Sequence, residues 1–154
     1  EFLNGYEFLD FACRFYQGTA DRQTILDYGN VIGMNDIVLS RRVHTYSKGM
    51  RQKLGIMGAV LAKASCLVLD EPMAGLDPAA RIAVKELLIQ ARRNGKTIVL
   101  SSHMLADMDD ICDTLLVIAG NRLQFQGMPS ELKRQGASDN LEKSFLALVG
   151  EDAS

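Results

Sequence analysis

The sequence contains no tryptophan, only three prolines and only three cysteines among its 154 residues. The cysteines, Cys13, Cys66 and Cys112, have neither the even number of a disulfide framework nor the spacing of metal ligands. We therefore expect reduced thiols, with Cys66 in the core, as in a cytosolic protein. No run reaches the roughly 18 apolar residues that a membrane-spanning helix needs, and no basic leader precedes an apolar segment. The net charge of −2 gives no sign of a nucleic-acid partner.

The most informative stretch is residues 66–78, Cys-Leu-Val-Leu-Asp-Glu-Pro-Met-Ala-Gly-Leu-Asp-Pro. Its apolar start predicts a buried strand that delivers Asp70 and Glu71 to its carboxyl end. Pro72 and Gly75 predict a turn directly afterwards, which would let the two carboxylates act on one ligand. In open α/β sheets this end of the strand is where ligands bind. One carboxylate could hold a metal and its neighbour act as a base, although Asp-Glu-Pro alone is also compatible with a solvated strand end.

Two amphipathic helices, near residues 3–16 and 21–32, open the chain and predict a small helical lobe. The aromatic residues of the first helix are expected in core or interface packing, because no basic residues are interleaved with them. A third helix begins after Ser47, a good N-cap, and runs to about residue 63. Lys48, Arg51 and Lys53 lie at its positive end, where acidic residues are normally favoured. This helix start could therefore bind a phosphate group, or it could be merely a solvated start.

A strand, a helix and a second strand follow in the order of a right-handed parallel crossover. Asp77 and Pro78 are typical of a helix start, and Asn94-Gly95 of its end. The next strand covers residues 96–101. Gly95-Lys96-Thr97, at the junction with this strand, imitate the end of a phosphate loop. However, Gln90 stands where that motif requires its first glycine, and the segment runs from helix into strand. We therefore reject it, and no other stretch of the sequence supplies such a loop.

His103 follows this strand, so it is expected at the sheet edge that carries Asp70 and Glu71. A histidine there can donate to a phosphate oxygen or orient water, although a lone histidine is often structural. Further along the chain, we expect a short helix at residues 104–112 and a hairpin of residues 114–119 and 122–126 around Gly120-Asn121. Helices at about residues 130–135 and 141–149 complete the chain.

Four motifs in this order resemble one family: Tyr46-Ser47-Lys48-Gly49-Met50, the Leu-Val-Leu-Asp-Glu-Pro of residues 67–72, the Ala-Gly-Leu-Asp of residues 74–77, and Ser102-His103. Together they resemble the ATP-binding domain of ABC transporters, over its helical subdomain and the carboxyl-terminal part of its catalytic core. The resemblance implies an α/β fold: a partial P-loop NTPase (RecA-like) parallel sheet flanked by helices, with an amino-terminal helical subdomain. It divides the chain into a helical subdomain (1–63), a partial ATPase core (64–127) and carboxyl-terminal helices (128–154).

The resemblance also implies roles for individual residues in binding ATP and Mg²⁺. Asp70 would help to hold Mg²⁺ as the Walker B aspartate. Glu71 would act as the base or water-orienting residue, and His103 would contact the γ-phosphate. Asp77 would belong to the D-loop. The family's signature motif would reach the nucleotide bound by a second ATP-binding domain. In this sequence its residues would be Ser47, Lys48, Gly49 and Met50.

The signature departs from the family's usual leucine-serine-glycine-glycine-glutamine at Tyr46, Lys48 and Met50. This variant, and the ending at residues 141–148, resemble bacterial exporters of the ABC-2, drug-resistance or sodium-efflux kind. The implied partners are a transmembrane permease and a second ATP-binding domain, at the cytoplasmic face of the cell membrane. Two alternatives stay open at this point: a non-catalytic docking module for a transmembrane partner, and part of a soluble ABC-type ATPase.

The family's Walker A loop, adenine-stacking aromatic residue and Q-loop are not found among these 154 residues. We therefore expect a fragment that neither binds ATP tightly nor hydrolyses it at a meaningful rate by itself. In the family, the strand leading into the Walker A loop lies between the strands expected at 96–101 and 114–119. Its absence would expose strand edges, so self-association of the fragment is expected.

Overall fold

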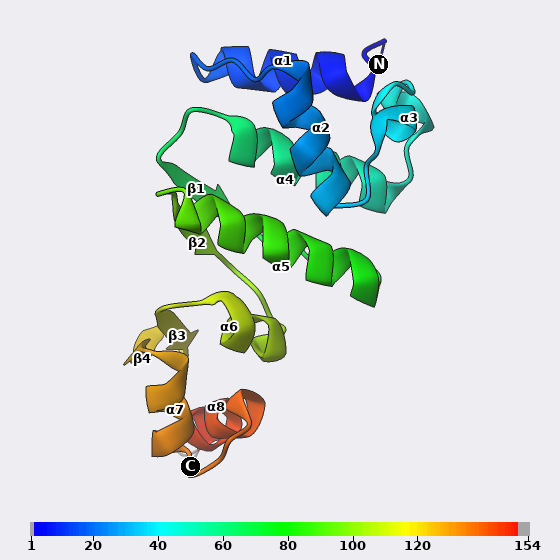
Figure 1. The fold of residues 1–154 in the computed structure, drawn as a ribbon. Helices are drawn as coiled ribbons and strands as arrows, with labels where there is room; N and C mark the ends of the chain where they lie inside the picture. Colours follow the sequence, from blue (N-terminus) through cyan, green and yellow to red (C-terminus); the bar gives the residue numbers. More distant parts are fainter. Residues whose placement is uncertain (1, 151–154) are drawn as a thin grey trace. The chain divides into compact units, whose positions relative to one another are not determined.

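The computed structural model describes residues 2–150, which form two compact units, residues 2–101 and 102–150. The first unit contains a helical part and a small parallel sheet, and the second contains a β-hairpin with three helices (Figure 1). This division reflects which segments of the backbone lie close to one another in space. The three-part division into residues 1–63, 64–127 and 128–154 concerns family subdomains and stays a prediction.

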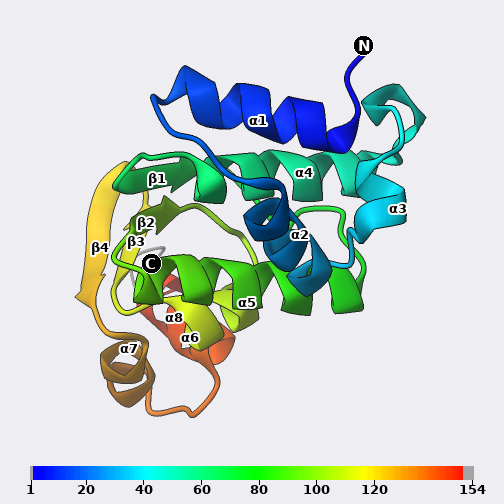
Figure 2. The same ribbon diagram turned by 45° about the horizontal axis from the view of Figure 1, so that its top comes forward.

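The first unit begins with two helices that the sequence pattern predicted, whereas the short helices Asp36–Leu39 and Val43–Thr45 were not predicted. Their bounds, with those of the strands, are α1 (Gly5–Phe15), α2 (Arg22–Val31), α3 (Asp36–Leu39), the 3₁₀ helix η1 (Val43–Thr45), α4 (Lys48–Leu61), β1 (Cys66–Leu69), α5 (Pro78–Arg93) and β2 (Thr97–Leu100). Helix α1 packs along α4, and α4 also contacts α5 (Figure 2). Fully buried Leu9, Leu39, Leu54, Met57 and Leu87 form the centre of this packing.

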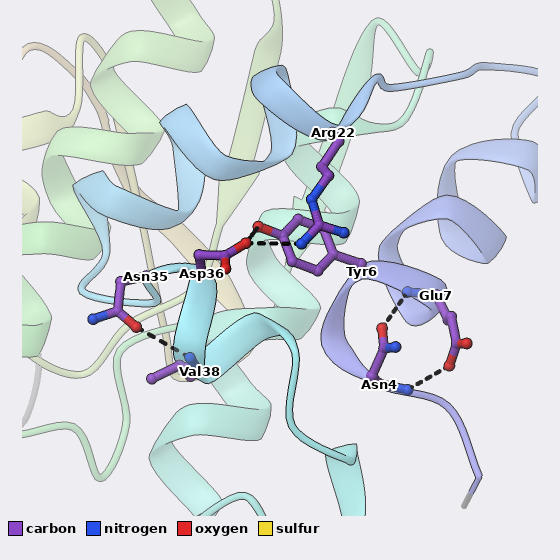
Figure 3. Close-up of polar contacts among 7 residues, drawn as sticks. All are labelled: Asn4, Tyr6, Glu7, Arg22, Asn35, Asp36 and Val38. Atoms are coloured by element: carbon purple, nitrogen blue, oxygen red, sulfur yellow. Dashed lines mark hydrogen bonds and ion pairs between the residues drawn. The ribbon is translucent and has the colours of Figure 1, made fainter.

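Capping side chains define where these helices begin. Asn4 and Glu7 form a reciprocal capping box at α1, and Asp21 accepts the Thr24 N–H at the start of α2 (Figure 3 for Asn4). The hydrogen bonds that the Asp21 carboxylate accepts from Thr24 hold the pKa of this carboxyl below its usual range. The N-termini of α1 and α2 are thus fixed by side chains no more than three residues away in the sequence.

Helix α5 confirms the pattern prediction most fully. Its predicted stripe, Val84, Leu87, Leu88 and Ala91, is buried throughout. The helix contacts β2, and β1 and β2 pair in parallel, as the strand–helix–strand order predicted. The helix ends at Asn94, after which Gly95 adopts a φ of 88° that suits glycine.

Strand β1 differs from the prediction of a buried strand. Leu67 is buried, but Val68 is 78% exposed and Cys66 is also exposed. The expectation that Cys66 is a core thiol is wrong, because alternate residues of a strand point to opposite faces and Cys66 shares its face with Val68. Burial raises the pKa of the Cys13 thiol, which does lie in the core.

The aromatic residues of α1 divide in a similar way. Tyr6 is buried, whereas Phe11 and Phe15 are 60% and 72% exposed. Of the two expected settings, core packing does not hold for the last two, since a single helix can turn only one stripe toward its neighbours, and interface packing stays a prediction. Phe15 stacks edge-on against Tyr16, with their ring centroids 5.2 Å apart.

The second unit contains α6 (Leu105–Ile111), β3 (Leu115–Ala119), β4 (Arg122–Gly127), α7 (Pro129–Gln135) and α8 (Leu141–Gly150). Strands β3 and β4 form the predicted antiparallel hairpin. Gly120 and Asn121 have φ values of 56° and 58°, as a two-residue turn of this twist requires. Phe125, Leu132 and Leu141 are buried in this unit, in which α7 contacts both β4 and α8.

Candidate active site

The candidate site is built where β1 ends and the chain turns at residues 70–77, hereafter the 70–77 turn. Leu69 pairs with Leu100 in the parallel register, so the next residues of the two strands, Asp70 and Ser101, lie side by side. Glu71 then adopts a φ of 46°, in the left-handed region that non-glycine residues seldom occupy. This backbone change redirects the chain directly after the strand, as the sequence predicted for Pro72.

The Ser101 side chain connects the two carboxylate residues. Its hydroxyl donates to Asp70 Oδ1 over 2.5 Å and accepts the backbone N–H of Glu71 over 3.0 Å. Asp70 is exposed and Glu71 is half-buried. Both acidic side chains therefore remain accessible, while the backbone between them is held by a residue of the neighbouring strand.

A second bond holds the turn from the helical part. The Gln52 side-chain amide, on α4, donates to the Pro72 carbonyl over 2.7 Å. Within the turn, Ala74 N–H donates to the Glu71 carbonyl over 3.1 Å, and Gly75 adopts a φ of 72°. Since α4 starts at the signature residues, Gln52 connects their helix directly to the carboxylate-bearing turn.

The signature residues lie at the start of α4. Ser47 is the predicted N-cap and accepts the Met50 N–H over 3.2 Å. Gly49 is close to the turn, because a Cβ built on it would lie 3.4 Å from Leu76 Cδ2. Lys48 is exposed and Met50 is half-buried.

The structure assigns two of the three basic side chains near this helix start to backbone carbonyls. Lys53 donates to the Ile32 carbonyl over 2.8 Å, and Arg51 donates to the Tyr46 carbonyl. Tyr46 is itself buried, and its hydroxyl donates to the Val38 carbonyl over 2.7 Å. Arg51 and Lys53 therefore bind backbone carbonyls of the helical part, and phosphate binding by this helix start stays a prediction.

Asp77 and His103 complete the set of predicted site residues. Asp77 caps α5 by accepting the Ala80 N–H over 2.9 Å, which confirms the predicted helix start. His103 is exposed and belongs to the second unit, directly before α6. Its expected approach to Asp70 and Glu71 stays a prediction.

Among the described residues, no group of three or more histidine, cysteine or acidic side chains could hold a metal by itself. Asp70 nevertheless fits Mg²⁺, which favours hard oxygen ligands and is usually held by one or two carboxylates together with phosphate oxygens and water. Ser101 engages only Oδ1 of Asp70, so Oδ2 is available for such an ion or its water. The donor set thus suits a cation that a nucleotide brings with it.

A separate charged cluster in the helical part has a structural explanation. Asp36 accepts from the Tyr6 hydroxyl over 2.7 Å and from Arg22 over 2.8 Å, and the Arg22 guanidinium lies 4.0 Å from the Tyr6 ring centroid (Figure 3). These bonds from Tyr6 and Arg22 lower the pKa of the Asp36 carboxyl. Burial raises the pKa of Tyr6, and its bond to Asp36 adds to this. The cluster joins α1, α2 and α3.

Sequence reasoning missed three residues: Ser101, Gln52 and Lys96. Lys96 belongs to the false phosphate-loop motif, and its amino group donates to the Ala62 and Ala64 carbonyls over 2.7 and 2.6 Å. It therefore binds the end of α4 rather than a phosphate. For Ser101, its position next to Asp70 in a parallel pair was an available signal, whereas no spacing rule links Gln52 to Pro72.

Comparisons with known proteins show the family to which the chain belongs. Residues 28–106 match the family described as "AAA domain, putative AbiEii toxin, Type IV TA system". An uncharacterized ABC transporter ATP-binding protein of Synechocystis is 36% identical over 135 residues, which cover 86% of this chain and 38% of that protein. The chain belongs to the ABC transporter ATP-binding proteins and carries this AAA domain.

Two further relatives support the assignment to ABC transporter ATP-binding proteins. EcsA of Bacillus subtilis, an ABC-type transporter ATP-binding protein, is 38% identical over 70% of this chain and 44% of its own length. The fluoroquinolones export ATP-binding protein of Mycobacterium tuberculosis is 34% identical over 85% of this chain and 42% of its own length. The chain thus spans about two-fifths of the length of the curated relatives it matches.

A solved structure confirms the fold class of this ABC protein. The ATP-binding subunit of an ABC transporter superposes with a TM-score of 0.80 at 28% identity, covering 95% of this chain and 62% of that one. The fold is therefore a partial P-loop NTPase, RecA-like parallel sheet flanked by helices. Among residues 2–150, no helix is long and apolar enough to cross a membrane.

Proposed function

We propose that this chain is the hydrolytic and signature-bearing part of the ATP-binding subunit that powers an ABC transporter. The observation that carries the proposal is the 70–77 turn, in which Ser101 and Gln52 hold an exposed Asp70 and a half-buried Glu71 at the carboxyl end of a parallel strand. Ligands of open α/β sheets bind at this end. Residues 1–63 would form the helical subdomain, 64–127 the partial core and 128–154 the carboxyl-terminal helices.

In this proposal the acidic residues have separate tasks. Asp70 would hold Mg²⁺ partly through water, and this ion would supply positive charge to the phosphates. Glu71 accepts a proton from, or orients, the water that attacks the γ-phosphate. His103 donates to a γ-phosphate oxygen. Because phosphoryl transfer depends mainly on positioning and electrostatics, the fixed backbone at Glu71 is the chain's main contribution.

The signature residues act on a second ATP-binding domain. Ser47, Lys48, Gly49 and Met50 present the N-terminus of α4 and one exposed cation to the nucleotide held there. Asp77 lies at the same domain interface as part of the D-loop. The other partner is a transmembrane permease, which places the protein at the cytoplasmic face of the membrane. The export named for the mycobacterial relative, together with the signature variant, favours an exporter.

A polypeptide of only these 154 residues would hydrolyse ATP slowly, because none of its segments is a phosphate loop. Calorimetry with MgATP tests this point. We expect weak binding by the polypeptide alone and tighter binding after addition of a segment that carries the Walker A half of the Synechocystis relative. Tight binding by the polypeptide alone would contradict this part of the proposal.

The central experiment measures phosphate release by the full-length protein that carries these residues. Glu71→Gln should reduce hydrolysis by about 10²–10⁴-fold, the usual contribution of a general base, while ATP remains bound. Glu86→Gln, an exposed position on α5, is the matched control and should hydrolyse ATP normally. If Glu71→Gln hydrolyses ATP like Glu86→Gln, the hydrolytic role is wrong and the docking alternative gains support.

A further inference from the structure

The Ser101 hydroxyl bridges the two acidic residues but has no role in the chemistry proposed above for them. It lies 2.5 Å from Asp70 Oδ1 and 3.0 Å from the Glu71 nitrogen. A serine hydroxyl has one hydrogen to donate and lone pairs to accept with. Since the Glu71 N–H can only donate, the serine hydrogen is directed at Asp70, and the orientation of the hydroxyl is determined by its two neighbours.

This bridge acts on Glu71, a non-glycine residue of the turn with a positive φ. Glu71 has a φ of 46°, and a non-glycine residue stays in that region only when surrounding bonds hold it there. The direction of the Glu71 side chain depends on this torsion. Strand pairing brings Ser101 to the turn, because its own N–H donates to the Leu69 carbonyl over 3.0 Å. Pairing of β2 with β1 therefore determines the position of Ser101, and its hydroxyl in turn holds the Glu71 N–H in place.

The same bridge also selects one oxygen of Asp70. By engaging Oδ1, Ser101 restricts rotation of the Asp70 carboxylate and leaves Oδ2 outside this hydrogen bond. A carboxylate held in one orientation loses less conformational freedom when it binds a cation. The serine thus affects both the cation-binding residue and the base without reaching a substrate.

We propose that Ser101 is a positioning residue, whose hydroxyl sets the Asp70 carboxylate and the Glu71 backbone for hydrolysis. This inference rests on the proposed function of the same site. A purely structural role would consist of ending β2, and any small residue could do that at an exposed position. The two roles differ in whether the hydroxyl itself is needed.

Hydrogen exchange of the nucleotide-free, full-length protein tests the bridge directly. Pro72 has no N–H, so two peptides that begin at the same residue and end at Asp70 and at Pro72 differ only by the Glu71 amide, whose exchange is obtained by subtraction. In Ser101→Ala we expect the Glu71 amide to exchange about tenfold faster, the effect of losing one hydrogen bond. Ser101→Thr, which keeps the hydroxyl, should restore protection. Ser65→Ala, an exposed serine just before β1, is the matched control and should leave exchange unchanged.

Kinetics of the same variants test the consequence for hydrolysis. Ser101→Ala should lower kcat about tenfold with little change in KM for ATP, and should require more Mg²⁺ for half-maximal rate. Ser101→Thr should recover both values. Wild-type exchange and kinetics in Ser101→Ala, or a Thr variant as impaired as the Ala variant, would overturn the inference.

The exchange measurement separates this inference from the proposed function. If Glu71→Gln hydrolyses ATP normally, the proposed function is wrong, whereas exchange still shows whether Ser101 holds the turn. If Glu71→Gln is inactive and Ser101→Ala exchanges and hydrolyses like Ser65→Ala, only the Ser101 inference is wrong. Melting temperatures of all variants identify any that are unfolded.

Discussion

Two carboxylates of the first unit, Asp36 and Asp70, are held in different ways. Asp36 receives bonds from Tyr6 and Arg22, so its charge is balanced by a cation and a hydroxyl from neighbouring helices. Asp70 receives the Ser101 hydroxyl, while the turn that follows is held through its backbone. A structural carboxylate is thus paired with a cation, whereas the candidate functional one is oriented and remains open to a ligand.

The comparison extends to what stabilises each region. The helical part depends on buried apolar side chains, and the 70–77 turn depends on single polar bonds from Ser101 and Gln52. Core substitutions should therefore change stability more than catalysis, and substitutions around the turn should do the reverse. This contrast predicts a graded series of stability losses, from the apolar core to the charged cluster of Asp36.

The largest loss of stability is expected for Leu9→Ala on α1. Leu9 is fully buried, and removing its side chain leaves a cavity that costs about 2–5 kcal/mol. Phe11→Ala, an exposed position on the same helix, should cost much less despite removing a larger side chain. Chemical denaturation of both variants measures the difference. Equal losses would mean that the exposed face of α1 is covered in the full-length protein.

A smaller loss is expected for Lys96→Met. This substitution removes the two bonds from one amino group to the Ala62 and Ala64 carbonyls, and because bonds that share a donor are not additive and Lys96 is half-exposed, we expect a total loss of about 1.5–3 kcal/mol. Denaturation midpoints should fall, while KM for ATP stays near the wild-type value. The exposed Lys143→Met is the control for loss of a charge. A large rise in KM without loss of stability would show that this lysine binds phosphate after all.

Gln52→Leu tests the connection between α4 and the turn. We expect a stability loss of about 1 kcal/mol, because one hydrogen bond to the Pro72 carbonyl disappears. Hydrolysis should fall more than this stability loss explains, since the backbone that carries Glu71 is released. Phosphate release measured at temperatures where the variant is fully folded separates the two effects. Normal hydrolysis would mean that Ser101 alone holds the turn.

The smallest effect concerns pH and the Asp36 cluster. The pKa of Asp36 is lowered in the folded state by Tyr6 and Arg22, so the folded protein binds its proton less readily than the unfolded chain does. The stabilisation is present above the ordinary aspartate value of about 3.9 and is lost as the pH falls through the lower, folded value. Asp36→Asn should therefore be less stable than wild type at pH 7, and the difference should shrink below about pH 4.

Denaturation series at several pH values measure this difference. The double variant Asp36→Asn with Tyr6→Phe serves as the control, and its loss should be smaller than the sum of the two single losses, because both substitutions remove the same bond. A wild-type pH dependence in Asp36→Asn would show that the cluster is not the source of the effect.

Local sequence signals were sufficient for most of the secondary structure. The caps Ser47 and Asp77 and the buried stripe of α5 follow rules that involve residues three or four apart. The hairpin at Gly120-Asn121 likewise follows from two residues that tolerate positive φ. The ordered motifs also identified the family, since each was found on the expected kind of element.

The exposure of β1 and the support of the site were decided by tertiary structure. Four consecutive apolar residues cannot reveal that Leu67 is covered while Cys66 and Val68 are exposed, because burial depends on which other elements pack on each face. The bonds from Ser101 to Asp70 and from Gln52 to Pro72 join residues 31 and 20 positions apart. The sequence by itself determined which residues are candidates for the chemistry, and the folded arrangement decided which others hold them, because such bonds depend on distance in space rather than on spacing along the chain.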